Sequence, residues 1–428
     1  IYNLKAVVQK TGLKPDTLRA WERRYDLPQP DRTEGGHRLY SQRDVDIIKW
    51  LIARRREGLN IKRAVALWRK LEEEGRAPLR TAPIAPSPPA TVIQGSTIAD
   101  LREAWIAACL DFDEQTAEGL LTQAFALYPP ETVGLDLLLR GLAQIGQAWY
   151  EGHVTVQQEH FASELAVRRL EALLMAAPPP SRPGQLLVAC PPGELHTLGP
   201  LVLTLMLRRQ GWNVTYLGAN VPIERMEATV SSLRPRMVIL SAQQLHTAAT
   251  LLDMARFLQQ QEEEPAVVFG GGIFNRLPTL RTRIPGHFLG ESLKTVGQVV
   301  EHLMTAPRSA PEVEPGCPAC EKALSHYRQQ RPLIEATVWE QLADSEVPAD
   351  RIGEANRRFA RNVEAALSLG DIDFMDVHIG WVEGLQREDG ITGRTLPPYL
   401  RVYRDAIETH LDERGQPILD WLTRRIEG

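Results

Sequence analysis

Apolar residues follow two different spacings along this chain of 428 residues. In most of it they recur every three or four positions, as on one face of an amphipathic helix. Between residues 181 and 305, short apolar runs instead alternate with helical stretches, which predicts strands and helices in turn. The expected parts are residues 1–75, a proline-rich linker at 76–97, a four-helix bundle at 98–180 (with one of its helices from Thr132 to Gly152), the alternating region 181–305, a second linker at 306–320 and an all-helical region at 321–428.

The alternating region is expected to form an α/β doubly wound, five-stranded parallel sheet, because one helical stretch separates each apolar run from the next. Such sheets bind ligands beyond the carboxyl ends of their strands. The expected strands are 185–190, 212–217, 236–241, 266–270 and 286–289, with helices at 198–210, 223–233, 246–261 and 292–304.

Residues 1–75 combine short helices with turn chemistry. A helix at 4–11 precedes a second helix that begins near Pro15, and residues 28–39 have the composition of a β-hairpin wing. Ser41 and Asn60 are expected to cap two further helices. On the second helix, Leu18, Trp21 and Tyr25 are expected to pack inward. The side chains expected to face a nucleic acid are Thr17, Arg19, Arg23, Arg24, Arg32, His37, Arg38 and Tyr40.

Charge separates this N-terminal part from the rest of the chain. Residues 1–70 hold 17 Lys and Arg against 8 Asp and Glu, whereas the whole chain has a net charge of −5, so the remaining residues carry −14. A basic end on an acidic protein indicates a polyanionic partner for that end alone.

The string R-x-W-E-R-R-Y-x-L-P-x-P, followed by R-T-x-x-G-x-R-x-Y, resembles the head of MerR-type winged helix-turn-helix proteins. The resemblance implies a double-stranded DNA operator, bound by a homo-oligomer (dimer or tetramer) because one such head covers a half-site. The alternative from the residues alone is a basic, solvated pair of helices.

Composition also bears on location. No apolar run is long enough to span a bilayer, and no secretory leader is visible at the start of the sequence. Four cysteines are too few for a disulfide scaffold and fit a reducing compartment. The expectation is a cytoplasmic protein without a membrane partner.

Candidate chemistry follows the first expected strand, where the sequence reads Glu194-Leu-His196-Thr-Leu-Gly199. This E-x-H-x-x-G spacing resembles the motif of cobalamin-binding domains. The resemblance implies that His196 is an axial ligand to cobalt (the metal of cobalamin) and that Glu194 holds its other nitrogen, an ordinary arrangement at metal sites. Gly199 would let the backbone pass close to the corrin.

Two later strand ends lie on the same expected edge of the sheet. In cobalamin domains a Ser or Thr there contacts the buried nucleotide tail, which implies this role for Ser241. Gly270 and Gly271 would let the tail lie against backbone. A run of glycines by itself is a weak signal and also fits a tight turn.

In the helical bundle, Trp149 is followed by Glu159 and His160. This W-x₉-E-H spacing resembles the light-sensing cobalamin regulators of the CarH/LitR type, which implies that these side chains cover the upper, adenosyl ligand. The alternative is that Trp149 is a core residue and the other two are ordinary surface groups. Tyr150 stands where that family usually has a histidine, so water, or the nearby His153, is expected above the cobalt after illumination.

The helical region 321–428 is expected to contain segments at 321–331, 333–343, 348–369, 371–386, 397–413 and 415–427. Its arrangement after a cobalamin domain is similar to the photocobilins, which implies biliverdin or another tetrapyrrole near His326, His378 or His410, with a turn at Arg394 and Pro397-Pro398-Tyr399. The alternative is a dimerisation or docking bundle with surface histidines.

Cys317 and Cys320 form a C-x₂-C pair, which is half of a zinc site. Without a second pair nearby, two unligated surface cysteines are the favoured interpretation, with Cys317 as a candidate attachment thiol.

Together these features predict a cobalamin-dependent, light-responsive transcriptional regulator that uses adenosylcobalamin and is not an enzyme. The alternatives are a corrinoid carrier or isomerase subunit, cobalamin sensing without photochemistry, and a dual cobalamin/bilin photoreceptor. A carrier or isomerase requires a substrate barrel or a partner catalytic domain, and no stretch of the sequence has that pattern.

Overall fold

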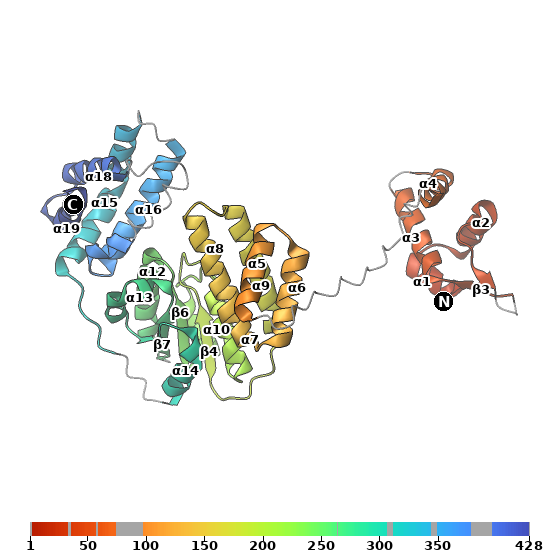
Figure 1. Cartoon of the computed structure of the whole chain (residues 1–428), viewed down its shortest axis with the longest axis horizontal. Coiled ribbons are helices and arrows are strands. Elements are labelled where there is room, and N and C mark those ends of the chain that lie inside the picture. Colours follow the sequence, from red (N-terminus) through yellow and green to blue (C-terminus); the bar gives the residue numbers. More distant parts are fainter. Residues whose placement is uncertain are drawn as a thin grey trace. The chain divides into compact units, whose positions relative to one another are not determined.

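The structure, a computed structural model, describes residues 2–32, 36–56, 59–73, 97–262, 264–305, 311–343, 349–377 and 396–427. It falls into two compact units, Ile1–Val92 and Ile93–Gly428 (Figure 1). Within the described residues, no helix combines the length and apolar character needed to cross a membrane.

The N-terminal unit packs short helices around a small antiparallel sheet of order β1-β3-β2. The predicted caps are confirmed, because Asp44 accepts hydrogen bonds of 2.7 Å from the backbone N–H and the hydroxyl of Ser41, and Asn60 Oδ1 accepts one of 2.9 Å from the Arg63 N–H. Leu18 and Trp21 pack inward as predicted. The elements are β1 (Tyr2–Asn3), α1 (Leu4–Thr11), α2 (Pro15–Tyr25), β2 (Asp31–Arg32), β3 (Arg38–Tyr40), α3 (Gln42–Arg56) and α4 (Ile61–Glu73).

The second unit begins with a layer of helices around a shared apolar core that includes Trp105 and Leu165. One predicted helix, from Thr132 to Gly152, is instead divided by a π-helical stretch, η1, in which the position of a Gly134 Cβ would lie 3.2 Å from Val202. The elements are α5 (Ile98–Leu110), α6 (Glu114–Leu127), α7 (Pro130–Thr132), η1 (Val133–Leu139), α8 (Arg140–Tyr150) and α9 (Val156–Met175).

The predicted parallel sheet is confirmed, and its described strands lie in the order β5-β4-β6-β7-β8. Alternate residues point to opposite faces, so Leu187 and Leu240 pack toward α12 whereas Leu186 and Ile239 pack toward α10 and α14. The strands are β4 (Gln185–Ala189), β5 (Asn213–Tyr216), β6 (Met237–Ser241), β7 (Ala266–Gly270) and β8 (His287–Phe288). The helical elements are α10 (Leu198–Arg209), α11 (Met226–Leu233), α12 (Leu245–Gln259), α13 (Gly272–Arg276), η2 (Pro278–Arg283), η3 (Leu293–Thr295) and α14 (Val296–Thr305).

Helix α10 carries apolar residues around most of its circumference, because it is packed between the sheet and the layer of helices. Leu203 and Leu207 face the sheet, whereas Val202 and Leu205 face the layer formed by α5 to α9. A helix that is hydrophobic all round is typical of a buried position between two layers.

The C-terminal helices differ from the sequence prediction in their boundaries. The predicted segments 321–331 and 333–343 form one helix, α15, that continues through Pro332. Tyr327, Ile334 and Val338 are buried along its length, so packing outweighs the hydrogen bond that a proline removes. The elements are α15 (Pro318–Leu342), α16 (Ala349–Ser368), η4 (Ile372–Met375), α18 (Leu396–His410), η5 (Glu413–Gly415) and α19 (Gln416–Glu427).

One further prediction about this region is wrong, and others lie outside the described residues. Pro398 and Tyr399 lie in the first turn of α18 rather than in a loop, so the predicted turn at Pro397-Pro398-Tyr399 is wrong. His378, Arg394 and most of the predicted segment 371–386 lie outside the described residues.

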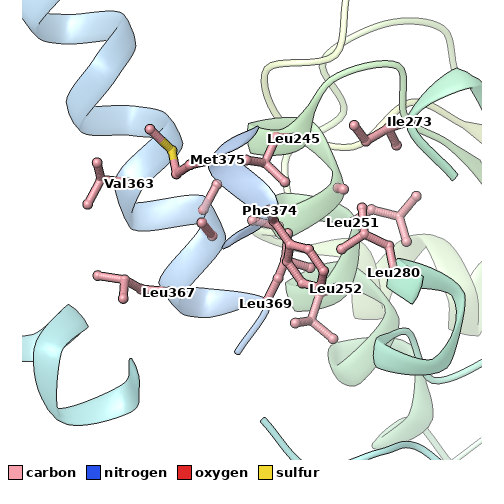
Figure 2. Close-up of a cluster of buried hydrophobic side chains, with 14 of the residues drawn as sticks. Leu245, Leu251, Leu252, Ile273, Leu280, Val363, Leu367, Leu369, Phe374 and Met375 are labelled. Atoms are coloured by element: carbon pink, nitrogen blue, oxygen red, sulfur yellow. The ribbon is translucent and has the colours of Figure 1, made fainter. Parts of the chain in front are cut away.

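The C-terminal helices share one hydrophobic core with the sheet. Figure 2 shows Leu251 and Leu252 of α12 beside Phe374 and Leu369, which come from η4 and the end of α16. All four side chains are at most 4% exposed. Burial of this kind stabilises by about 25 cal/mol per Å² of apolar surface, so α12 is held from both the sheet and the C-terminal helices.

Replacement of Phe374 tests this shared core. Phe374→Ala leaves a cavity between η4 and α12 and should lower the free energy of unfolding by about 3–5 kcal/mol. The matched control is Leu333→Ala, since Leu333 is 52% exposed and its truncation should change stability by no more than about 0.5 kcal/mol. Urea unfolding followed by circular dichroism measures both. Equal, small effects would contradict a core that spans α12 and η4.

Candidate functional site

The loop after β4 places Glu194 and His196 at the carboxyl edge of the sheet, as predicted. The loop after β5 fixes its backbone: the Asn220 N–H donates to the Glu194 carbonyl at 2.9 Å, and Asn220 Oδ1 accepts from the Gly193 N–H at 2.7 Å. Gly193 has a φ of +82°, in the left-handed region that favours glycine. The loop conformation is thus set by residues on two neighbouring strand ends.

Glu194 is fully buried and accepts four hydrogen bonds. Its Oε1 accepts from His196 Nδ1 at 2.6 Å and from the His196 backbone N–H at 2.9 Å. Its Oε2 accepts from the Gln243 N–H and the Thr247 hydroxyl, both at 2.7 Å. A buried carboxylate is tolerated only when its oxygens are satisfied in this way.

These bonds shift the pKa values of both partners. Burial by itself would raise the pKa of Glu194, but the hydrogen bonds from His196 and Thr247 and the charge of His196 hold it below its ordinary value. The hydrogen bond to Glu194 raises the pKa of His196, against the opposing effect of burial. The pair therefore stabilises the fold fully between about pH 4.5 and 6.5, the ordinary values of the two groups. That contribution is lost as pH falls through the lowered pKa of Glu194 or rises through the raised pKa of His196.

His196 is exposed to solvent on the side of the ring away from Glu194, where Nε2 lies. Its side chain is 57% exposed, and with Nδ1 held by the carboxylate the neutral ring has its lone pair on Nε2. Gly199, in the first turn of α10, has no atom within 4 Å of the position that a Cβ would take. An oriented imidazole beside open space is suited to bind a metal that arrives from solvent.

One of the two glycines at the next strand end is required by packing within the protein. Gly271 has a φ of +118°, and a Cβ there would lie 2.0 Å from the Ala242 carbonyl oxygen. Gly270 pairs with Ser241 across β6 and β7, and Ser241 is half-buried at the end of its strand. The structure explains Gly271 without a ligand, whereas contact of Ser241 and Gly270 with a nucleotide tail stays a prediction.

Helix α9 brings Glu159 toward the histidine. Glu159 Oε1 accepts from the Ser163 hydroxyl at 2.7 Å, and Oε2 lies 2.9 Å from His160 Nδ1. The charge of Glu159 contributes to raising the pKa of His196. Trp149 is half-buried against the core of the helical layer.

The alternative histidine of this region lies between α8 and α9. His153 is 74% exposed and pairs with Glu151 at 3.6 Å. Tyr150 is half-buried at the end of α8. A role for either residue above a cofactor stays a prediction.

Several residues at the site were not predicted from the sequence. Gln243 and Thr247 hold Glu194, and the one signal for them in the sequence is that they are polar residues shortly after the third strand. His246 is buried beside them, and burial together with the charge of Arg361, on α16, lowers its pKa to about 4. The C-terminal helices therefore reach the surroundings of Glu194.

Comparison with known proteins agrees with this geometry. Residues 101–174 and 184–300 match the B12 binding domain, and residues 2–71 match the MerR HTH family of regulatory proteins. The HTH-type transcriptional repressor CarH of Myxococcus xanthus is 34% identical over 273 residues, which are 63% of this chain and 88% of that protein. The repressor CarA of the same organism is 33% identical over 243 residues, 56% of this chain and 75% of CarA. The chain belongs to the CarH family.

Membership in the CarH family makes this chain a cobalamin-based, DNA-binding transcriptional regulator and not an enzyme. Among solved structures, a monomethylamine corrinoid protein of Methanosarcina barkeri is similar with a TM-score of 0.43 and 16% identity, over 49% of this chain and 100% of that one.

The candidate DNA surface of this CarH-family chain lies on α2 and the β2–β3 hairpin. Arg19, Arg23 and Arg24 are exposed on α2, and Thr17 is half-buried there. Arg32 and His37 are exposed on the hairpin. Arg19 lies 3.5 Å from Asp16 on the same helix, a contact between exposed groups that is worth little.

Arg38 and Tyr40 instead connect the hairpin to α2. Both bind Glu22: Arg38 Nε donates at 2.8 Å, and the Tyr40 hydroxyl donates at 2.5 Å. Tyr40 is fully buried, and burial followed by the bond to Glu22 raises its pKa. Buried Tyr40 has no access to a phosphate, so the structure gives it a positioning role in place of the predicted DNA contact.

The electrostatic effect of the buried Glu194 carboxylate can be tested through the pKa of His196. Glu194→Gln keeps an acceptor but removes the charge, so the pKa of His196 should fall. This pKa is measured by following the NMR resonances of the imidazole ring as the pH is varied. The matched control is Glu151→Gln beside exposed His153, which should leave the pKa of His196 unchanged. An unchanged His196 pKa in Glu194→Gln would contradict the electrostatic role of Glu194.

Proposed function

We propose that this CarH-family regulator responds to light through adenosylcobalamin, with His196 as the lower axial ligand of the cobalt. The observation that carries the proposal is a fully buried carboxylate, Glu194, which holds Nδ1 of a half-exposed imidazole and leaves Nε2 free for a metal. A carboxylate in this position fixes the tautomer and raises the basicity of the ligating nitrogen.

The donor set fits a metal that brings most of its own ligands. Among the described residues, no three His, Cys, Asp or Glu side chains converge on one point. A single oriented histidine would suit a corrinoid, because the macrocycle brings its other nitrogen donors with it. The open space at Gly199 supports the same interpretation, since a Cβ there would meet no atom of the protein.

The helical layer would cover the opposite side of the corrin. Adenosylcobalamin, when bound, supplies a cobalt–carbon bond that light can break. Trp149, Glu159 and His160 would enclose the upper ligand, with Glu159 oriented by Ser163. Without that ligand, these side chains would lose a buried contact, and α8 and α9 would be freer to shift on α10. Such a shift changes the surface available for self-association.

DNA binding would depend on assembly. A single helix-turn-helix covers one half-site, so two or more heads are required for an operator. We propose a dimer or tetramer whose assembly depends on the state of the helical layer. Because Tyr150 replaces the usual histidine, the position above the cobalt would take water after illumination, or His153 if its pairing with Glu151 opens.

For the C-terminal helices, the contacts favour docking over tetrapyrrole binding. His326 is buried and lies 3.2 Å from Asp412, and His410 Nε2 lies 2.7 Å from the Thr337 hydroxyl. His410 thus has a protein partner already, whereas Nδ1 of buried His326 lies at ion-pair distance from Asp412 but makes no hydrogen bond within the described residues. The core of this region is also continuous with that of α12. We propose that structural changes pass between this module and the rest of the unit through its contact with α12.

Loss of the axial ligand tests the switch. His196→Ala should weaken adenosylcobalamin binding by more than Glu194→Gln, whose effect should be within about 10–100-fold. Affinity should also decrease at acidic pH, because the raised pKa of His196 favours the protonated ring that cannot bind metal. Titration with adenosylcobalamin, followed by absorbance, measures the affinity of each variant and its dependence on pH. The control is His302→Ala, at an exposed position on α14.

Light should change assembly and DNA affinity together. For the chain loaded in the dark, light scattering gives the mass and fluorescence anisotropy gives the DNA affinity before and after green light. We expect both to change in the wild type and neither to change in His196→Ala. Identical mass and affinity in the dark and the light would contradict the switch.

Arginine replacement tests the DNA surface. Arg23→Ala should weaken specific DNA binding by about 1–3 kcal/mol if the side chain reaches a base edge. Arg43→Ala is the control, since it removes the same charge from an exposed position paired with Glu72 on α4. Binding should also weaken with salt as counterions are released. Equal losses in both variants, or affinity that is independent of salt, would count against α2 as the DNA-reading helix.

A further inference from the structure

Cys317 and Cys320 lie at the first turn of α15, where the C-terminal helices begin. Cys317 is the N-cap residue and is exposed, whereas Cys320 is 3% exposed. The prediction of two surface cysteines is therefore wrong for Cys320. Helix α15 starts at Pro318, which puts Cys320 on the same face as the buried Ala323 and Tyr327.

The two cysteines are close enough to form a disulfide. The Cys320 N–H donates to the Cys317 carbonyl at 3.0 Å, so the residues span one tight turn. Cα atoms three residues apart on such a turn are about 5–6 Å apart, within the range of disulfides.

The two sulfurs differ in reactivity. Backbone N–H groups of Cys320 and Ala319 at the start of the helix, together with the Cys320 thiol, lower the pKa of Cys317. Burial raises the pKa of Cys320 to about 12. An exposed cysteine with thiolate character beside a buried partner is the arrangement of thiol–disulfide exchange sites, where one sulfur attacks and the other resolves.

We propose that Cys317 and Cys320 form a redox-active dithiol that exchanges with low-molecular-weight disulfides of the glutathione class. The Cys317 thiolate attacks one sulfur of the small disulfide, forms a mixed disulfide and releases one thiolate, which takes a proton from water. Cys320 loses its proton to water, attacks the Cys317 sulfur and expels the second thiolate. One small disulfide is reduced to two thiols, and the protein dithiol is oxidised to a disulfide by two electrons.

Oxidation would act on the contact between α15 and η4. The backbone N–H of Ile372, in η4, acts to lower the pKa of Cys320, and the Cys317 N–H donates to the Gly370 carbonyl at 3.0 Å. A disulfide would fix the Cys320 sulfur to Cys317 and so change how this end of α15 contacts η4. Because Phe374, two residues further on, packs against α12, the dithiol is connected to the same helix that holds Glu194.

The test uses the full reduced chain, oxidised glutathione and mass spectrometry after alkylation. We expect the wild type to lose two hydrogens, with one disulfide between Cys317 and Cys320 that dithiothreitol reverses. Cys320→Ser should stop at a mixed disulfide with one glutathione on Cys317. Cys317→Ser should neither form the disulfide nor bind glutathione. Buried Cys109 and Cys190 stay unmodified in all forms and serve as internal controls.

The pH dependence of alkylation separates reactivity from mere exposure. Iodoacetamide should modify Cys317 with a midpoint pH below that of an ordinary thiol, and the midpoint should move upward in Cys320→Ala, whose side chain has no hydrogen-bond donor. Two outcomes would overturn the proposal: a wild type that accumulates only the mixed disulfide, or purified protein that retains zinc on the two thiols and resists oxidation. Neither depends on cobalamin, so the result is independent of the proposed light response.

Discussion

The buried carboxylate of Glu194 is the constraint on which the geometry of the site depends. A charge with no solvent contact is stable only if donors surround it, and here they come from the loop itself, the end of β6 and the first turn of α12. His196 is one of those donors. Its ring direction is therefore set by the sheet and by α12, not by the loop alone.

Helix α12 connects this constraint to the rest of the second unit. Its first turn carries Thr247, which binds Glu194, and its buried face carries Leu251 and Leu252, which pack against η4 and the end of α16 (Figure 2). A change in the C-terminal helices can thus reach the histidine through one rigid element. His246, buried beside Arg361 of α16, lies on the same path.

Local pattern predicted most of the fold, because strands, caps and turns depend on neighbours in sequence. The five strands and the caps at Ser41 and Asn60 are examples. The features that were predicted wrongly or not at all depend on contacts between residues distant in sequence. Proline at 332 does not end α15 because Ile334 and Val338 are buried on its far side. The E-x-H spacing likewise identified Glu194 and His196, but Thr247 is 53 residues from Glu194 and no local pattern connects them.

The most direct test of the account is the electron paramagnetic resonance spectrum of the reduced, cobalt(II) form of the cobalamin-loaded chain. An axial nitrogen of natural ¹⁴N splits each cobalt line into a triplet. In protein labelled with ¹⁵N-histidine the account predicts doublets, because the ligating nitrogen belongs to His196. Triplets that persist in the labelled protein would show that the nitrogen comes from the cofactor's own base and would contradict it.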